Sequence, residues 1–93
     1  MDFEWDETKR QSILIERNVD LLDAVLIFEG PVITEIDSRR DYGELRFVSL
    51  GLVEGKAFYV IHTERDGRTR LITAWQGGRI GKRRHQARFP SGN

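Results

Sequence analysis

The 93-residue sequence contains no cysteine, only two prolines and no long apolar segment. Without cysteine the chain can form neither a disulfide nor a thiolate metal site, which is compatible with a reducing compartment. No apolar run approaches the roughly 20 residues that a membrane-spanning helix needs. The start, MDFEWDETKR, is acidic where a signal peptide would have a basic region and an apolar core. We therefore expect a cytoplasmic protein without membrane contact, and the length predicts a single domain over 1–93.

Acidic residues are absent after Asp66, although the formal net charge of the whole chain is zero. Residues 1–44 hold 12 acidic and 5 basic side chains, whereas residues 45–93 hold 3 acidic and 10 basic ones. Such asymmetry indicates a surface that meets an anion, and nucleic acid is the most common candidate. A second interpretation is a solvated, partly frayed basic tail, and charge alone does not decide between the two.

Two helices are predicted near the N-terminus. Asp6 and Asp20 are residue types that cap helix N-termini, and apolar residues follow each of them at helical spacing. The sequence therefore predicts helices over about 6–17 and 20–28. Gly30-Pro31 ends the second helix.

After residue 31 the apolar pattern changes to a period of two, which predicts strands. Four strands are expected, at about 32–36, 44–52, 56–63 and 68–75. Glu54-Gly55 and Asp66-Gly67 have the composition of hairpin turns, so the last three strands should form an antiparallel meander.

A last, basic helix is predicted over 79–89, after a flexible Gln76-Gly77-Gly78 joint. Gly81 lies inside this helix and should cost it about 1 kcal/mol relative to alanine. Residues 90–93 are expected to form a disordered tail. The predicted fold class is α+β: two N-terminal helices and a four-stranded, mainly antiparallel sheet, then the C-terminal basic helix, with the helices on one face of the sheet.

Several short strings, taken in their order and spacing, resemble the BrnT family. The family begins with Phe-x-Trp-Asp-x-x-Lys, which is present here as Phe3, Trp5, Asp6 and Lys9. The most specific string is Asp-x-Arg-x-Asp-Tyr-Gly-Glu-x-Arg, which is present over 37–46. Further matches are Glu16–Leu21, Ala24, Ile27, Phe28, Gly51, Thr63, Arg65 and Arg70–Ala74. The resemblance covers about residues 3–74.

The resemblance implies a RelE-like (RelE/ParE) fold, cleavage of RNA and growth arrest by the free protein. It also implies that a ribbon-helix-helix antitoxin of the BrnA kind neutralises the protein. Only this antitoxin would contact operator DNA in the complex. The sequence departs from the family after Ala74. Trp75-Gln76-Gly77 stands where the family has Arg-Lys-Ala, and Gly81-Lys82 occupies the region of a family glutamate. The C-terminal signature is therefore matched only in part.

Metal-independent cleavage of RNA uses the ribose 2′-hydroxyl as nucleophile. The enzyme must remove its proton, stabilise charge on the phosphate and protonate the leaving oxygen. Arginine suits the phosphate because it stays charged and donates in a fork, whereas carboxylates and histidines suit proton transfer. The candidate catalytic residues are Arg65, Arg70, Glu44 and His85.

Each of these candidates also has a structural interpretation. Arg65 and Arg70 flank the last hairpin at family positions and should bind phosphate, unless they are solvated arginines at strand ends. Glu44 could act as a base, but a residue of this kind more often anchors a turn or an ion pair. Its natural partner is Arg46, two positions later on the same strand face. His85 could donate a proton or be one more solvated residue of the tail.

The other candidates are RNA-binding residues: Arg46, Trp75, Arg79, Lys82, Arg83 and Arg84. Trp75 could stack on an RNA base beside the basic segment, or it could complete the core at the end of a strand, which we prefer. His62 shares a strand face with Phe58 and Val60 and is expected to be a structural histidine. Two separated histidines without cysteine are a poor zinc set, so neither a metal site nor a cofactor is expected.

The leading functional hypothesis is a ribonuclease toxin of a type II toxin–antitoxin system. One alternative is a catalytically impaired homologue that retains antitoxin binding and serves in regulation. Another is a non-enzymatic RNA-binding module that uses the basic C-terminal segment. We expect an acidic segment of the antitoxin to cover the basic surface in the complex.

Overall fold

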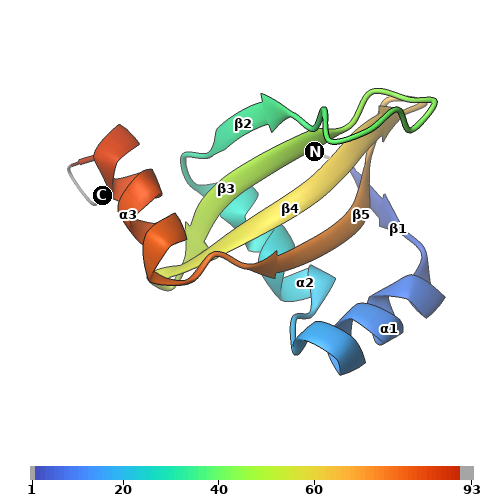
Figure 1. The fold of residues 1–93 in the computed structure, drawn as a ribbon. Coiled ribbons are helices and arrows are strands. Elements are labelled where there is room, and N and C mark those ends of the chain that lie inside the picture. The colour runs from blue at the N-terminus through green and yellow to red at the C-terminus, as the bar shows by residue number, and fades with distance from the viewer. Residues whose placement is uncertain (1, 91–93) are drawn as a thin grey trace.

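The computed structural model describes residues 2–90, and Figure 1 shows its fold. The elements, in chain order, are β1 (Phe3–Trp5), α1 (Glu7–Arg17), α2 (Leu21–Ala24), the 3-10 helix η1 (Val25–Glu29), β2 (Ile33–Ile36), β3 (Phe47–Val53), β4 (Lys56–Arg65), β5 (Arg68–Gln76) and α3 (Gly78–Arg88). The strands form one five-stranded sheet in the order β1-β5-β4-β3-β2. The α+β class is therefore confirmed. Of the tail expected at 90–93, residues 91–93 lie outside the described residues.

The sheet differs from the predicted one because it contains a fifth strand. β1 pairs in parallel with β5, with Phe3 opposite Thr69 and Trp5 opposite Leu71, whereas all other neighbouring strands are antiparallel. The prediction of four strands is wrong because a strand of three residues is too short to show a period of two. The meander of β3, β4 and β5 is confirmed.

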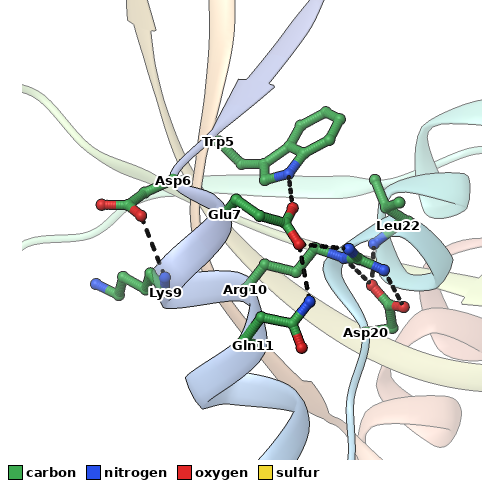
Figure 2. Close-up of polar contacts among 8 residues, drawn as sticks. All are labelled: Trp5, Asp6, Glu7, Lys9, Arg10, Gln11, Asp20 and Leu22. Carbon is green, nitrogen blue, oxygen red and sulfur yellow. Dashed lines mark hydrogen bonds and ion pairs between the residues drawn. The ribbon is translucent and has the colours of Figure 1, made fainter.

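The two N-terminal helices begin at the predicted caps. The Asp6 carboxylate accepts the backbone N–H of Lys9 at 3.2 Å, and the Asp20 carboxylate accepts that of Leu22 at 2.9 Å. The second helix is α-helical only over Leu21–Ala24 and continues as η1, so it is tighter than predicted. Figure 2 shows how Arg10 joins the helices: its guanidinium donates to both oxygens of Asp20, at 2.7 and 2.8 Å.

One face of the sheet packs on α1, α2 and η1 and forms the core (Figure 1). The buried cluster consists of Ile13, Val19, Leu21, Ala24, Ile27, Val60, Leu71 and Ala74. Gly51, in the middle of β3, lets η1 approach closely, because an added Cβ would lie 2.6 Å from the Cβ of Ile27.

The C-terminal helix α3 lies on the other face, at the end where β3 and β4 are joined (Figure 1). Gly81 of α3 packs over Ala57 and Tyr59, whose side chains point away from the core. The expectation that all helices share one face is therefore wrong for α3. Within residues 2–90, α3 covers only this end, and we call the remainder of the surface the open face. The sheet residues that line its hollows are Val48, Tyr59, Ile61, Thr73 and Trp75, of which Ile61 is buried and the others are half-buried.

Candidate functional site

Glu44 lies between two arginines of the open face. Its Oε1 accepts from Arg65 Nη2 at 2.8 Å, and its Oε2 accepts from Arg46 Nε at 3.1 Å. The hydrogen bond from Arg65, followed by that from Arg46, holds the pKa of the Glu44 carboxyl below its ordinary value. Glu44 is therefore ionised at neutral pH and neutralises part of the charge of both arginines.

Arg70 belongs to the same end of the face. Its Nη1 donates to Glu4 Oε2 at 2.9 Å, and the charge of Glu4 also acts on Arg65. We call Glu4, Glu44, Arg46, Arg65 and Arg70 the Glu44 cluster. Sequence reasoning missed Glu4, because it lies on the strand β1 that the apolar pattern did not reveal.

The loop over 37–46 positions the cluster from the side of β2 and β3. The buried carboxylate of Asp37 accepts from Arg39 Nε and Nη2, at 2.8 and 2.9 Å, and from the Tyr42 hydroxyl at 3.1 Å. The Arg39 guanidinium is the main reason that the pKa of Asp37 falls to about 2. The guanidinium of Arg46 lies over the Tyr42 ring, 4.3 Å from its centre. The loop is therefore ordered by charged hydrogen bonds.

Asp37, Arg39 and Tyr42 were not predicted as site residues. Their signal was present, because they belong to the most specific family string, but no chemical role could be assigned to them from spacing alone. The structure shows that Asp37 fixes the two side chains that stand beside Arg46 and Trp75.

Three hollows follow one another across the open face, and Arg39 borders all of them. The first, of about 370 Å³, is lined by Arg40, Tyr42 and Arg46. The second, of about 410 Å³, is lined by Arg17, Thr73 and Trp75. The third, of about 240 Å³, is lined by Ile36, Val48, Tyr59, Ile61 and Trp75. Together they form a groove from the Glu44 cluster toward α3, and we call it the open-face groove.

Trp75 lies in this groove and not in the core. Its indole stacks on Tyr59 with 5.5 Å between ring centres, and it is half-buried. The guanidinium carbons of Arg17 and Arg39 each lie 5.6 Å from the centre of the indole. The preferred sequence interpretation, that Trp75 completes the core, is wrong because its strand position faces away from the core cluster.

The two histidines have different surroundings. His62 is buried on the core side, where its Nε2 lies 2.8 Å from the Ser49 hydroxyl and burial lowers its pKa. The expectation of a structural histidine is confirmed. His85 is buried on α3, with Nε2 at 2.8 Å from the carbonyl oxygen of Pro31. Because a carbonyl only accepts, Nε2 carries the hydrogen. His85 therefore faces Pro31 and is not part of the Glu44 cluster, and the alternative of a solvated tail residue is wrong.

The structure separates the basic residues of α3. Arg84 donates to Glu35 and Tyr59 at the rim of the open-face groove. Arg79 and Lys82 line another hollow of about 240 Å³ beside the β3–β4 turn. Arg83 is exposed and has no ion pair within residues 2–90. Of the four α3 candidates, the structure places Arg84 next to the groove.

The family model of the BrnT ribonuclease toxin of type II toxin–antitoxin systems matches residues 5–77. The chain belongs to this family. The match spans the loop over 37–46, both sides of the last hairpin and Trp75. No curated protein matches this BrnT chain. Among its described residues, no helix combines the length and the apolar character needed to cross a membrane.

Proposed function

We propose that this BrnT protein cleaves RNA without a metal ion and that the Glu44 cluster is its active site. The observation that supports the proposal is the convergence of three arginines and an ionised carboxylate from three separate segments at one end of the groove. Arg46 and Arg65 would bind the scissile phosphate, and Arg70 would add positive charge beside it. Such preorganised donors stabilise the charge that builds up on phosphate in the transition state.

In the proposed reaction the ribose 2′-oxygen attacks phosphorus and the bond to the 5′-oxygen breaks. Glu44 takes the 2′-hydroxyl proton, and water protonates the leaving oxygen. The products are a 2′,3′-cyclic phosphate and a 5′-hydroxyl. In the free protein the arginines keep Glu44 weakly basic. When phosphate takes over their hydrogen bonds, the carboxylate loses its partners and its affinity for a proton rises.

The test is cleavage of a labelled RNA by purified toxin in the presence of a chelator. We expect fragments with cyclic phosphate ends, and Arg65→Ala should lower the cleavage rate strongly. Arg68→Ala is the matched control, because Arg68 is the strand partner of Arg65 and has no ion pair within the described chain. The proposal would be contradicted if the RNA stayed intact at low salt and cells that express the toxin alone grew normally.

We further propose a RelE-like mode of action in the cytoplasm, in which the cleaved RNA carries translation. A ribbon-helix-helix antitoxin of the BrnA kind would neutralise the toxin and bind operator DNA. An acidic antitoxin segment suits the open-face groove, because arginines border it from end to end. A structure of the complex that left this groove uncovered would contradict the arrangement.

Two observations favour a second candidate, a catalytically impaired toxin with a regulatory role. Trp75 occupies the position of a family arginine, and every arginine of the Glu44 cluster is paired with a carboxylate. Such a protein would bind antitoxin and RNA but would not arrest growth. The cleavage assay above distinguishes the two candidates.

A further inference from the structure

We propose that Trp75 holds an unpaired nucleobase of single-stranded RNA, with Arg17 and Arg39 binding the adjacent phosphates. The proposal rests on RNA as the substrate of the Glu44 cluster and adds a second binding position away from the bond that is cleaved. It also assigns a role to the departure from the family pattern that puts tryptophan at this position.

The first argument is the shape and composition of the surface around the indole. Trp75 and Tyr59 stack side by side on the sheet face opposite the core, where Tyr59 also contacts the end of the face that α3 covers. Ile36, Val48 and Ile61 line the same hollow, and Ile36 is 60% exposed. Its volume of about 240 Å³ lies below the usual range for a complete small-molecule ligand. A single planar base beside the half-buried indole of Trp75 suits such a hollow.

The second argument is the charge beside the ring. Arg17 and Arg39 both place a guanidinium carbon 5.6 Å from the centre of the indole. A guanidinium is planar and stacks on aromatic faces much as a base does, so an incoming base can take the place of one of them. Arg39 stays tied to Asp37, whereas Arg17 has no acidic partner in the described chain. Arg17 is therefore free to bind a phosphate once it leaves the indole.

The third argument is the path from the indole to the Glu44 cluster. Arg39 borders both the Trp75 hollows and the hollow that Arg46 lines, so the groove is continuous. Arg70 and Trp75 lie on the same strand, five residues apart, which corresponds to roughly 16 Å. The base on Trp75 therefore belongs to a nucleotide a short distance along the strand from the cleaved bond. Bases paired in a duplex are stacked on one another and cannot enter the hollow.

The groove suits RNA better than an uncharged protein segment, because arginines border its apolar walls. The two carboxylates that line it, Glu35 and Asp37, are each paired with an arginine. Stacking surfaces flanked by cations are the usual arrangement for single-stranded nucleic acid, where bases meet aromatic rings and phosphates meet basic side chains. Stacking is tolerant of base identity, so the position should select unpaired RNA without a strict sequence requirement.

The experiment uses Trp75 as its own probe. The chain has two tryptophans, so Trp5→Phe leaves Trp75 as the single one. Trp5 bonds to Glu7 and lies outside the groove. We would titrate this variant with a single-stranded RNA hexamer made uncleavable by 2′-O-methyl groups, and with a blunt duplex of the same sequence. We expect the hexamer to quench the fluorescence of Trp75 and the duplex to leave it unchanged.

Binding of the same hexamer, followed by polarisation of a label, gives the matched comparison. Trp75→Ala should weaken binding about 5- to 150-fold, whereas Trp75→Phe should retain most of it because a phenyl ring still stacks. Arg17→Ala should weaken binding less and reduce its dependence on salt. Circular dichroism first shows whether the Trp75→Ala protein is folded. If it is not, Arg17→Ala and the quenching of Trp75 fluorescence still test the proposal.

The proposal would be overturned by unchanged Trp75 fluorescence at saturating hexamer, or by equal affinity of the Trp75→Ala and parent proteins. Equal quenching by the duplex would show that no unpaired base is required and would also overturn it. The readout is separate from cleavage, because the probe cannot be cleaved. Quenching without RNase activity would contradict only the proposal that the Glu44 cluster is an active site. Cleavage without quenching would contradict only the proposal that Trp75 holds a base.

Discussion

Arg65 Nη2 lies 2.8 Å from Glu44 Oε1, although the two residues are 21 positions apart in the sequence. The contact joins the end of β4 to the segment that leads into β3, and it places a carboxylate at the position that we propose for the RNA phosphate. The proposed active site therefore predicts that substrate binding and the protonation of Glu44 are coupled, because phosphate and Glu44 would compete for the same guanidinium.

Replacing Glu44 by glutamine separates these two effects. Glu44→Gln keeps the shape but removes the charge that neutralises Arg46 and Arg65, so RNA should bind at least as tightly as to the parent. If Glu44 is the general base, the single-turnover cleavage rate should fall about 100- to 10,000-fold. The measurement is the cleavage rate at saturating enzyme beside the dissociation constant of an uncleavable RNA.

A purely structural role of Glu44 would change the cleavage rate and the RNA affinity in another way. In that case Glu44→Gln would loosen the loop over 37–46, and binding and rate would fall together. Asp41→Asn is a suitable control, because Asp41 is an exposed carboxylate of the same loop that bonds only to a backbone N–H, that of Gly43. It should change neither value.

The sequence predicts the pairing of Glu44 with Arg46, but it does not predict that Glu4 belongs to the same site. The predicted strand at 44–52 put Arg46 and Glu44 on one face, and they do pair, although β3 begins only at Phe47 and both residues precede it. Glu4 escapes prediction because a strand of three residues leaves no periodic pattern, and its parallel pairing with β5 depends on contacts between the two ends of the chain. The sheet face that α3 occupies is likewise set by packing of Gly81 on Tyr59, which local spacing cannot show.

Gly51 gives a prediction about packing. A Cβ at this position would lie 2.6 Å from Ile27 Cβ and 3.1 Å from Val32 Cγ1, and neither neighbour can move without disturbing the core. Gly51→Ala should lower the free energy of unfolding by about 1–3 kcal/mol. Gly30→Ala is the control, because nothing lies within 4 Å and the backbone is extended there. Urea unfolding of both variants checks the prediction, and equal midpoints would contradict it.

Gly81 should respond in the opposite direction to the same substitution. It lies inside α3, and the nearest atom to an added Cβ is Ala57 Cβ at 3.4 Å, which is close to ordinary contact. Gly81→Ala should therefore stabilise the protein by up to about 1 kcal/mol through helix propensity. Gly78→Ala in the same helix should destabilise it, because Gly78 has a φ of +64°. Thermal unfolding should rank the variants in this order, and a destabilised Gly81→Ala would show that α3 cannot shift even slightly.

His62 predicts how stability depends on pH. Burial lowers its pKa below the ordinary 6.5, while the charge of Glu64 opposes this in part. The unfolded chain therefore takes up a proton at a higher pH than the folded chain does. The stability that His62 contributes is complete above 6.5 and is lost as the pH falls through the folded pKa. The urea midpoint should fall over this range in the parent, and His62→Phe should reduce that fall. An unchanged slope in His62→Phe would assign it to other groups.

The paired contacts of Asp20 allow an ion pair and a helix cap to be tested separately. Its carboxylate binds the Arg10 guanidinium in a fork and also accepts the backbone N–H of Leu22 (Figure 2). Asparagine caps helices as well as aspartate does, so Asp20→Asn should lose the ion pair alone. Asp20→Ala should lose about 1 kcal/mol more through the missing cap. Thermal unfolding of both variants measures the two steps.

The same pair should also influence the groove, because Arg17 reaches Trp75 from the last residue of α1. If the bond between Arg10 and Asp20 holds α1 in place, Asp20→Asn should shift the fluorescence of Trp75 in a Trp5→Phe background. Ser12→Ala is the control, because Ser12 is exposed on the same helix, its hydroxyl bonds to the backbone carbonyl of Thr8, and it lines none of the three hollows. The prediction is contradicted if the Asp20→Asn protein has the Trp75 fluorescence and the RNA affinity of the parent. In that case α1 keeps its position without this ion pair, and the core contacts of Ile13 are sufficient to position Arg17.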